Sequence, residues 1–291
     1  GGRGGFCFFQ EEMNDALSRK AELESDIQTA LEKQQFVIEL QPIVDAGTLR
    51  IAGAEVLLRW QHPLHGLLSP TDFIRIAEET GQIAPISEWL LQESLGYAES
   101  WLSDDQLVTM PADSRSIDRP AITPSEEVSN PPAPGGAMPA TANSATANSG
   151  LFLAINLSQR QLINTQHVKR WQEIINNSRI PSHRITLELD EQVHFEDSAD
   201  IRHALNQLLM MGVKLSLNDF GNVESSLKML KNLPVSAVKV DFSSPRINPA
   251  DSRESKLNLA LVKMGLTLDL VVTAVGVENV RQLALLAEAG C

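Results

Sequence analysis

Polar side chains interrupt or end six apolar segments of this sequence, and most of them carry carboxylate or amide oxygens. These residues are Glu55, Asn156, Glu188, Asn218, Asp219, Lys239, Asp241 and Glu278. Oxygen ligands suit Mg²⁺ or Mn²⁺, and a lysine among them suits the negative charge of a phosphodiester. If the segments are neighbouring strands, their polar ends converge on one face, and we expect phosphodiester or metal chemistry there.

The segments themselves alternate with helical patterns. Short, nearly continuous apolar runs are typical of strands buried on both faces, as in a parallel sheet. We expect strands at residues 36–44, 51–60, 151–156, 185–189, 213–217, 237–240 and 271–277. Helices are predicted between them, including two over residues 71–102, with Thr71 as N-cap and Gly81 as the break. This alternation predicts an α/β barrel whose eighth strand would follow Cys291.

Composition limits the possible partners and surroundings. The net charge of -13 argues against long nucleic acid, whose phosphates require a basic surface. Cys7 and Cys291 match no metal or disulfide spacing, and no apolar run is long enough to cross a bilayer. We therefore expect a cytoplasmic protein. The chain begins without methionine, so we interpret it as a fragment that a membrane anchor could precede.

Two segments stand outside the strand–helix alternation. Residues 103–150 are rich in Pro, Ala, Ser, Thr and Asn, and we predict a disordered insertion there. Enlarging a loop of about six residues to about fifty costs only about 2 kcal/mol, which a barrel tolerates. Residues 1–34 contain a charged helix with an apolar stripe that includes Leu23 and Ile27. Two interpretations explain this stripe equally well: a solvated amphipathic linker helix, or a helix that joins a preceding domain to the barrel.

Seven motifs occur in an order that resembles the EAL domain family. They are FVIELQPIVD, AEVLLRW, INLSQRQL, LELDE, LNDFG, LPVSAVKVD and VGVE. The resemblance covers residues 35–291 and implies an EAL-type (β/α)₈, TIM-like barrel that lacks its last strand here. Residues 1–34 are similar to the tail of a GGDEF domain and its linker helix. The family further implies a possible homodimer through the barrel.

Members of the family hydrolyse cyclic di-GMP with two metal ions, and the resemblance implies a role for each matching residue. It implies metal ligation by Glu55, Asn156, Glu188 and Asp219, catalysis by Lys239 and Glu55, and cyclic di-GMP contacts by Gln41, Leu57, Arg59, Asp241 and Glu278. Lys239 would orient or activate the attacking water. Glu191 would steady the loop after the fifth strand. The implied cofactor is Mg²⁺ or Mn²⁺, if any metal is bound.

The sequence departs from the family at several of these positions. Asn218 stands where the family has the first of two aspartates, and Val275 stands where it has a metal-binding glutamate. Val223 also replaces a glycine of the following loop. A two-metal clamp needs these charges, so we predict a degenerate domain that binds cyclic di-GMP as a receptor with little or no hydrolysis. The alternatives are a weak metal-dependent phosphodiesterase producing pGpG and a scaffold that has lost the ligand.

Each residue also has a purely structural interpretation. Glu55 could pair with Arg59 within its own strand, and Lys239 could pair with Asp241 or Asp219. Asn156 read alone is a cap at a strand end, and Glu188 read alone is a surface residue. The structural and functional interpretations of the charged residues predict different ion pairs. The ion pairs in the folded chain therefore distinguish them.

Overall fold

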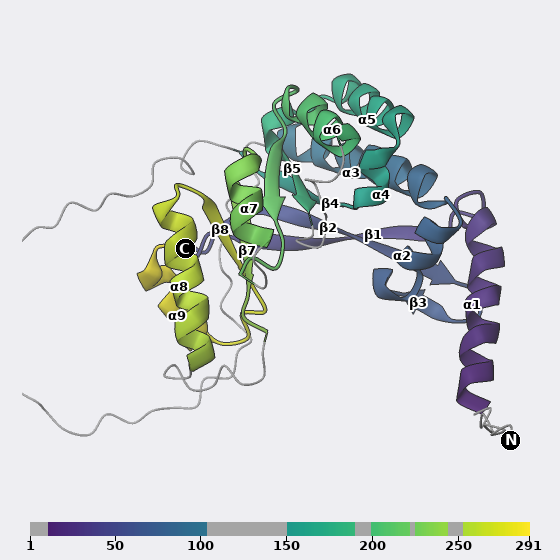
Figure 1. Cartoon of the computed structure of the whole chain (residues 1–291), viewed down its shortest axis with the longest axis horizontal. Coiled ribbons are helices and arrows are strands. Elements are labelled where there is room, and N and C mark those ends of the chain that lie inside the picture. The colour runs from purple at the N-terminus through teal and green to yellow at the C-terminus, as the bar shows by residue number, and fades with distance from the viewer. Residues whose placement is uncertain (1–10, 104–149, 190–198, 222–224, 244–252) are drawn as a thin grey trace, which may run out of the picture.

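The computed structural model describes residues 11–103, 150–189, 199–221, 225–243 and 253–291 (Figure 1). Its strands are β1 (Phe36–Val44), β2 (Ile51–His62), β3 (Gly66–Leu68), β4 (Phe152–Leu157), β5 (Ile185–Leu189), β6 (Lys214–Leu217), β7 (Ala237–Asp241) and β8 (Val271–Val275). Its helices are α1 (Glu11–Ala30), α2 (Pro70–Glu79), α3 (Ile83–Ser103), α4 (Gln159–Ile163), α5 (Thr165–Asn177), α6 (Ala199–Leu209), α7 (Ser225–Asn232), α8 (Arg253–Thr267) and α9 (Val280–Ala289), with a 3-10 turn η1 (Ser182–Arg184). The predicted disorder within residues 104–149 lies outside the described residues.

One curled sheet organises the chain. Its strands run in the order β1-β2-β4-β5-β6-β7-β8, with β3 paired to β2. β1 and β3 are antiparallel to β2, and every later pair from β2 to β8 is parallel. Helices follow the parallel strands and lie outside the curl (Figure 1). This confirms the predicted α/β barrel architecture, and within the described residues the sheet is open between β8 and β1.

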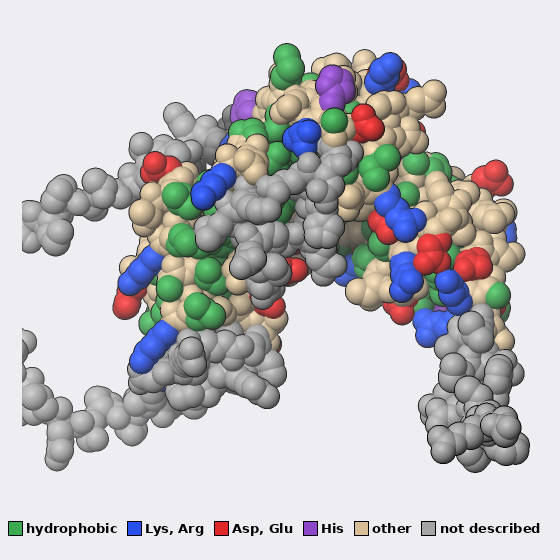
Figure 2. Space-filling model, viewed as in Figure 1, with side chains coloured by type: hydrophobic (Ala, Val, Ile, Leu, Met, Phe, Trp, Pro, Cys, Tyr) green, Lys and Arg blue, Asp and Glu red, His purple; other side chains and the backbone are tan. Residues whose placement is uncertain are grey.

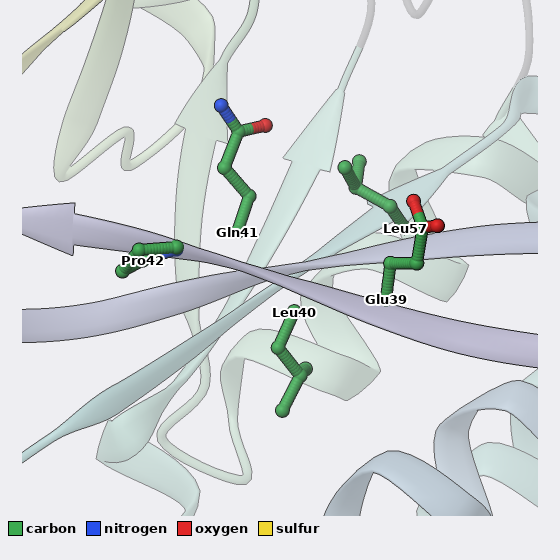
Figure 3. Close-up of a pocket in the computed structure, with 5 residues that line it drawn as sticks. All are labelled: Glu39, Leu40, Gln41, Pro42 and Leu57. Carbon is green, nitrogen blue, oxygen red and sulfur yellow. The ribbon is translucent and has the colours of Figure 1, made fainter.

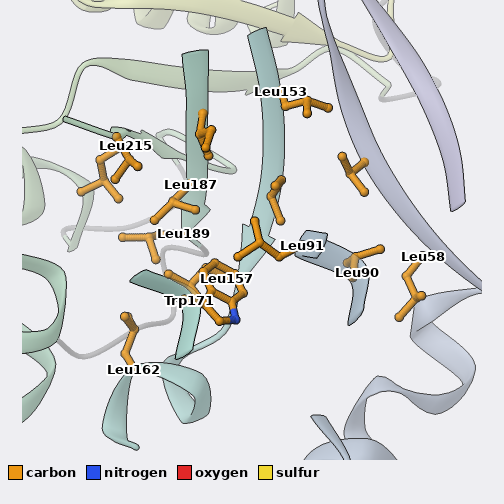
Figure 4. Packing of buried hydrophobic residues seen from close by; sticks show 14 of the residues in the cluster. Leu58, Leu90, Leu91, Leu153, Leu157, Leu162, Trp171, Leu187, Leu189 and Leu215 are labelled. Atoms are coloured by element: carbon orange, nitrogen blue, oxygen red, sulfur yellow. The ribbon is translucent and has the colours of Figure 1, made fainter. Parts of the chain in front are cut away.

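The two faces of the sheet carry different side chains. Leu157 of β4 and Leu189 of β5 are buried in one hydrophobic cluster with Trp171 of α5 (Figure 4). Asn156 and Glu188, each one position earlier, are partners in the register of the same strands. Because successive side chains point to opposite faces, these polar residues face the inside of the curl. Packing against the helices thus fixes which residues reach the interior.

Most predicted elements are confirmed, but one helix start and one strand end need correction and one strand was not predicted. Helix α2 begins at Pro70 with Ser69 as its N-cap, rather than Thr71, because proline is favoured at the first helical position. β8 ends at Val275, two residues earlier than predicted, since Gly276 adopts a positive φ of 71°. The strand β3 was not predicted, because three residues are too few to show a period.

Helix α1 lies at the opposite end of the molecule from α8 and α9 and packs on the β2–β3 corner (Figure 1). Its apolar stripe is confirmed, since Leu23 and Ile27 are buried. The buried His62 accepts the backbone N–H of Leu64 at Nδ1, so its Nε2 carries the proton and donates to Asp26 Oδ2 at 3.1 Å. Acidic and basic side chains mingle over this end of the surface (Figure 2). None of the described helices is long and apolar enough to cross a membrane.

Candidate ligand-binding site

The inner face of the sheet brings most of the predicted site residues together. Gln41 lies opposite Glu55, Asn156 beside Glu188, and Asp241 beside Val275. Residues two positions apart on a strand share a face. The same face therefore carries Gln41, Glu55, Leu57, Arg59, Asn156, Glu188, Lys239, Asp241 and Val275. The prediction that strand-end polar residues converge on one side is confirmed for this set.

Lys239 is the centre of this face. Its Nζ lies 2.7 Å from Glu55 Oε2 and 2.6 Å from Glu188 Oε2. The Lys239 and Glu188 side chains are almost completely buried, and that of Glu55 is 15% exposed. Three different strands supply the three charges, so the contact depends on how β2, β5 and β7 lie next to one another. Burial costs each of these charges its hydration, so the assembled cluster gains little, but removing one partner would leave a buried charge uncompensated and would be strongly destabilising.

Two amides extend the cluster. Asn156 Nδ2 donates to Glu55 Oε1 at 3.0 Å, and Asn218 Nδ2 donates to Asn156 Oδ1 at 3.1 Å. Asn218 follows β6, where its backbone N–H donates to the carbonyl of Leu189. Its own Oδ1 is buried and has no hydrogen-bond partner in the described part of the chain. An oxygen left in this way can accept a hydrogen bond from a ligand or water that reaches the cluster.

Burial and neighbouring charges shift the acidity of both glutamates. Burial raises the pKa of Glu188 to about 7; the negative charge of Glu55 adds to this effect and Lys239 opposes it. Burial also acts against ionisation of Glu55, but the charge and hydrogen bond of Lys239 and the hydrogen bond from Asn156 outweigh it, so the pKa of Glu55 is lowered. Of the two carboxyl groups that contact Lys239, that of Glu55 is therefore the more acidic.

An open depression borders the cluster on β1 and β2 (Figure 3). It is lined by Glu39, Leu40, Gln41, Pro42 and Leu57. Glu39 lies directly opposite Leu57 and shares its face with Gln41. Arg59, two residues further along β2, pairs through Nε with Glu39 Oε2 at 2.8 Å. The depression thus combines apolar side chains with an amide and a carboxylate, and the guanidinium of Arg59 lies beside it, held by Glu39. An apolar surface with an amide suits a planar base, and a neighbouring guanidinium suits a phosphate.

Three predicted residues, Asp241, Asp219 and Glu278, are not among the side chains that contact Lys239 above. The Asp241 carboxylate accepts hydrogen bonds from the backbone N–H and hydroxyl of Ser243, at 2.7 and 2.6 Å. Asp219 is exposed and has a positive φ of 55°. Glu278 is exposed, and its backbone N–H donates to Gln282. The proposed role of Glu191 lies outside the described residues.

The contacts overturn the purely structural interpretations of the charged residues. Arg59 pairs with Glu39, not Glu55, and Lys239 pairs with Glu55 and Glu188, not with Asp241 or Asp219. Glu188 is 2% exposed and is not a surface residue. Glu39 was missed because one exposed glutamate in a strand carries no signal by itself. Its spacing of two residues from Gln41 was the clue that both share a face.

The residues present do not fit a two-metal centre. Lys239 occupies the Oε2 atoms of both glutamates, and Asn156 Oδ1 already accepts a hydrogen bond from Asn218. Val275, on the same face, offers no donor atom. Within the described ranges no three His, Cys, Asp or Glu side chains are grouped so that they could hold one ion. An ion would have to displace the lysine ammonium, so we derive no chemical step through a metal.

The chain matches the EAL domain family over residues 24–127 and 138–291. It belongs to the EAL domain family. The site residues described above therefore sit on this family's barrel, in its motif order.

Relatives and solved structures agree with this assignment. The chain is 33% identical over its whole length to the bifunctional diguanylate cyclase/cyclic di-GMP phosphodiesterase MucR of Pseudomonas aeruginosa, covering 36% of that protein. It is 29% identical to the uncharacterized protein sll1895 of Synechocystis, covering 98% of this chain and 35% of that one. The chain thus spans about a third of the length of the curated relatives it matches.

Among solved structures, the PaMucR phosphodiesterase in complex with c-di-GMP aligns with a TM-score of 0.71 and 30% identity. The alignment covers 93% of this chain and 92% of that one. The cAMP-bound EAL enzyme Bd1971 aligns with a TM-score of 0.73 and 25% identity, over 97% of this chain and 67% of that one. The open curled sheet described here is therefore the fold of EAL domains.

Proposed function

We propose that this EAL domain binds cyclic di-GMP as a receptor or regulatory module and hydrolyses it little or not at all. The observation that carries the proposal is the Lys239 cluster. Lys239 binds one carboxylate oxygen of Glu55 and one of Glu188. At the positions of two further carboxylates of the family, this chain has Asn218 and Val275. Removing two carboxylates from a site that must balance two dications lowers metal affinity and with it the rate of hydrolysis.

Binding is supported by the depression beside the cluster. Gln41 and Leu57 line it, and Arg59, on the same face of the sheet, is the next residue of that face along β2. Arg59 presents a guanidinium, which can bind a phosphate through two parallel hydrogen bonds. The structurally similar PaMucR phosphodiesterase is named as a c-di-GMP complex, which supports the same ligand for this chain. The ligand has to compete with Glu39 for Arg59.

The alternative is a weak metal-dependent phosphodiesterase that forms pGpG. One observation favours it: Glu55, Glu188 and Lys239, which the family uses in catalysis, are buried together within 2.7 Å contacts. Displacement of the lysine by Mg²⁺ or Mn²⁺ would leave the two carboxylates available. The choice between receptor and enzyme therefore depends on whether metal supports turnover.

Calorimetric titration with cyclic di-GMP, with and without Mg²⁺, tests the proposal together with an assay for pGpG. We expect saturable binding in both conditions and negligible pGpG. Arg59→Ala should weaken binding at least about tenfold, because a charge-assisted hydrogen bond is lost. Arg75→Ala, at an exposed arginine of α2, is the matched control and should leave it unchanged. Efficient pGpG formation that Glu55→Ala abolishes would overturn the receptor assignment.

Restoring the two missing carboxylates tests the cause of the lost activity. Asn218→Asp or Val275→Glu alone should raise Mn²⁺ affinity little, because each leaves the cluster one carboxylate short. The double substitution should exceed the sum of the two, since both residues serve one cluster and neighbouring sites are not additive. If the double variant binds Mn²⁺ no better than either single variant, the two positions do not serve a common site.

The rest of the proposal concerns the whole protein. We propose a GGDEF-like domain before residue 35, which the diguanylate cyclase in the name of MucR supports. A homodimer through the barrel, a cytoplasmic location and the absence of nucleic acid partners are further proposals. Size measurement by light scattering, with and without cyclic di-GMP, tests the dimer.

A further inference from the structure

The position of the Lys239 ammonium is the starting point. It lies between two carboxylates that come from different strands, at 2.7 Å from Glu55 and 2.6 Å from Glu188. All three side chains are at least 85% buried, with exposures of 7%, 15% and 2%. Two buried carboxylates this close to each other need a cation, and here the chain supplies it.

Four oxygen atoms around this lysine already have partners, among them Glu188 Oε2, which accepts from Lys239. Glu55 accepts from Lys239 at Oε2 and from Asn156 at Oε1, while Asn156 Oδ1 accepts from Asn218. Only the Asn218 Oδ1 of these amides is left without a partner in the described part of the chain. Mg²⁺ prefers about six oxygen ligands, so it cannot enter while the ammonium keeps the two carboxylates.

We propose that Lys239 is the resident cation of this site and excludes a divalent ion from it. Its ammonium neutralises the glutamates in the place where the family holds metal, and Asn218 and Val275 remove the charge that would favour a dication over it. The site is complete without metal. The consequence that cyclic di-GMP binds equally well with and without Mg²⁺ rests on the proposed function.

Mn²⁺ alone is the probe, and its binding is followed by electron paramagnetic resonance on the full 291-residue chain. The chain itself should show no saturable Mn²⁺ site. Lys239→Met keeps an unbranched side chain and removes the charge, so it should gain one site, with affinity raised at least about tenfold. The gained site should disappear in Lys239→Met combined with Glu188→Gln. Lys263→Met, at an exposed lysine of α8, is the matched control and should gain none.

The outcomes separate this inference from the proposed function. A saturable Mn²⁺ site in the unaltered chain that Lys239→Met does not strengthen overturns the inference, even if cyclic di-GMP binds. A gained site in Lys239→Met supports it, even if cyclic di-GMP does not bind. Should Lys239→Met fail to fold, the unaltered chain decides alone: saturable Mn²⁺ binding overturns the exclusion, and its absence at millimolar Mn²⁺ supports it.

Discussion

Replacing Glu188 by glutamine should change how the stability of this domain depends on pH. Burial raises the pKa of Glu188 from 4.5 to about 7 in the folded chain. Below pH 4.5 the carboxyl group is protonated in both the folded and the unfolded chain. Between about 4.5 and 7 the unfolded chain loses the proton while the folded chain retains it, so stability falls as pH rises. Above about 7 both states are ionised and the loss is complete.

The size of the effect follows from the pKa difference. The folded and unfolded pKa values of Glu188 differ by about 2.5 units, and each unit corresponds to about 1.4 kcal/mol. The free energy of unfolding therefore falls by about 3 kcal/mol in all as the pH rises through both pKa values. Glu188→Gln removes this loss, because glutamine does not titrate. Glu55, whose pKa is lowered, contributes stability that is lost only as pH falls below its usual value, so it acts outside this window.

Urea unfolding followed by fluorescence of the buried Trp60 and Trp171 measures the free energy of unfolding at each pH. The quantity to compare is the difference between the unaltered chain and Glu188→Gln, because contributions common to both chains cancel in it. That difference should change by about 2–3 kcal/mol from pH 5 to pH 8 in favour of the variant, because part of the full loss has already occurred at pH 5. Glu173→Gln, at an exposed carboxylate, is the control and should follow the unaltered chain. Parallel curves for the chain and Glu188→Gln would refute the reasoning.

Two further stability predictions use matched substitutions. Asp26→Ala leaves the buried Nε2–H of His62 without an acceptor, so it should lower the free energy of unfolding by about 1–3 kcal/mol. Lys20→Ala, which removes only exposed ion pairs of the same helix, should matter far less, and an equal loss in urea unfolding would contradict this. Gly276→Ala should cost at least about 2 kcal/mol, because φ is +71° and its Cβ would lie 2.4 Å from a backbone nitrogen. Gly96→Ala, in α3, should instead raise the free energy of unfolding by about 0.5–1 kcal/mol in the same measurement. The added Cβ would meet no atom within 4 Å, and alanine favours the helix over glycine.

Much of the fold was predictable because its patterns are local. The segments of β1 and β5 were predicted with the boundaries that the structure has, since polar or charged residues flank each largely apolar segment on both sides. β3 was missed because its pairing with β2 depends on the turn geometry of a three-residue segment. The end of β8 was missed because a positive φ at Gly276 belongs to the folded backbone, while the apolar run continues past it.

The placement of these polar residues on one face of the sheet was also predictable, but their partners were not. The order of motifs placed Glu55, Asn156, Glu188 and Lys239 at strand ends, and strand alternation put them on one face. Which charge touches which depends on the neighbours of each strand and on their relative stagger. That is why the shared face of Glu39 and Gln41 could be found from their spacing, while the pair of Arg59 with Glu39 could not.

The sequence by itself determined that this chain is an EAL barrel with two carboxylates replaced, because residue types and the order of motifs can be recognised without the folded structure. Only the tertiary structure decided where the remaining charges meet. Ion pairing acts over a few ångströms, whereas Glu55, Glu188 and Lys239 are separated by more than a hundred residues of chain from first to last. Folding brings β2, β5 and β7 into one curl, and the lysine becomes the cation of the buried glutamates only there.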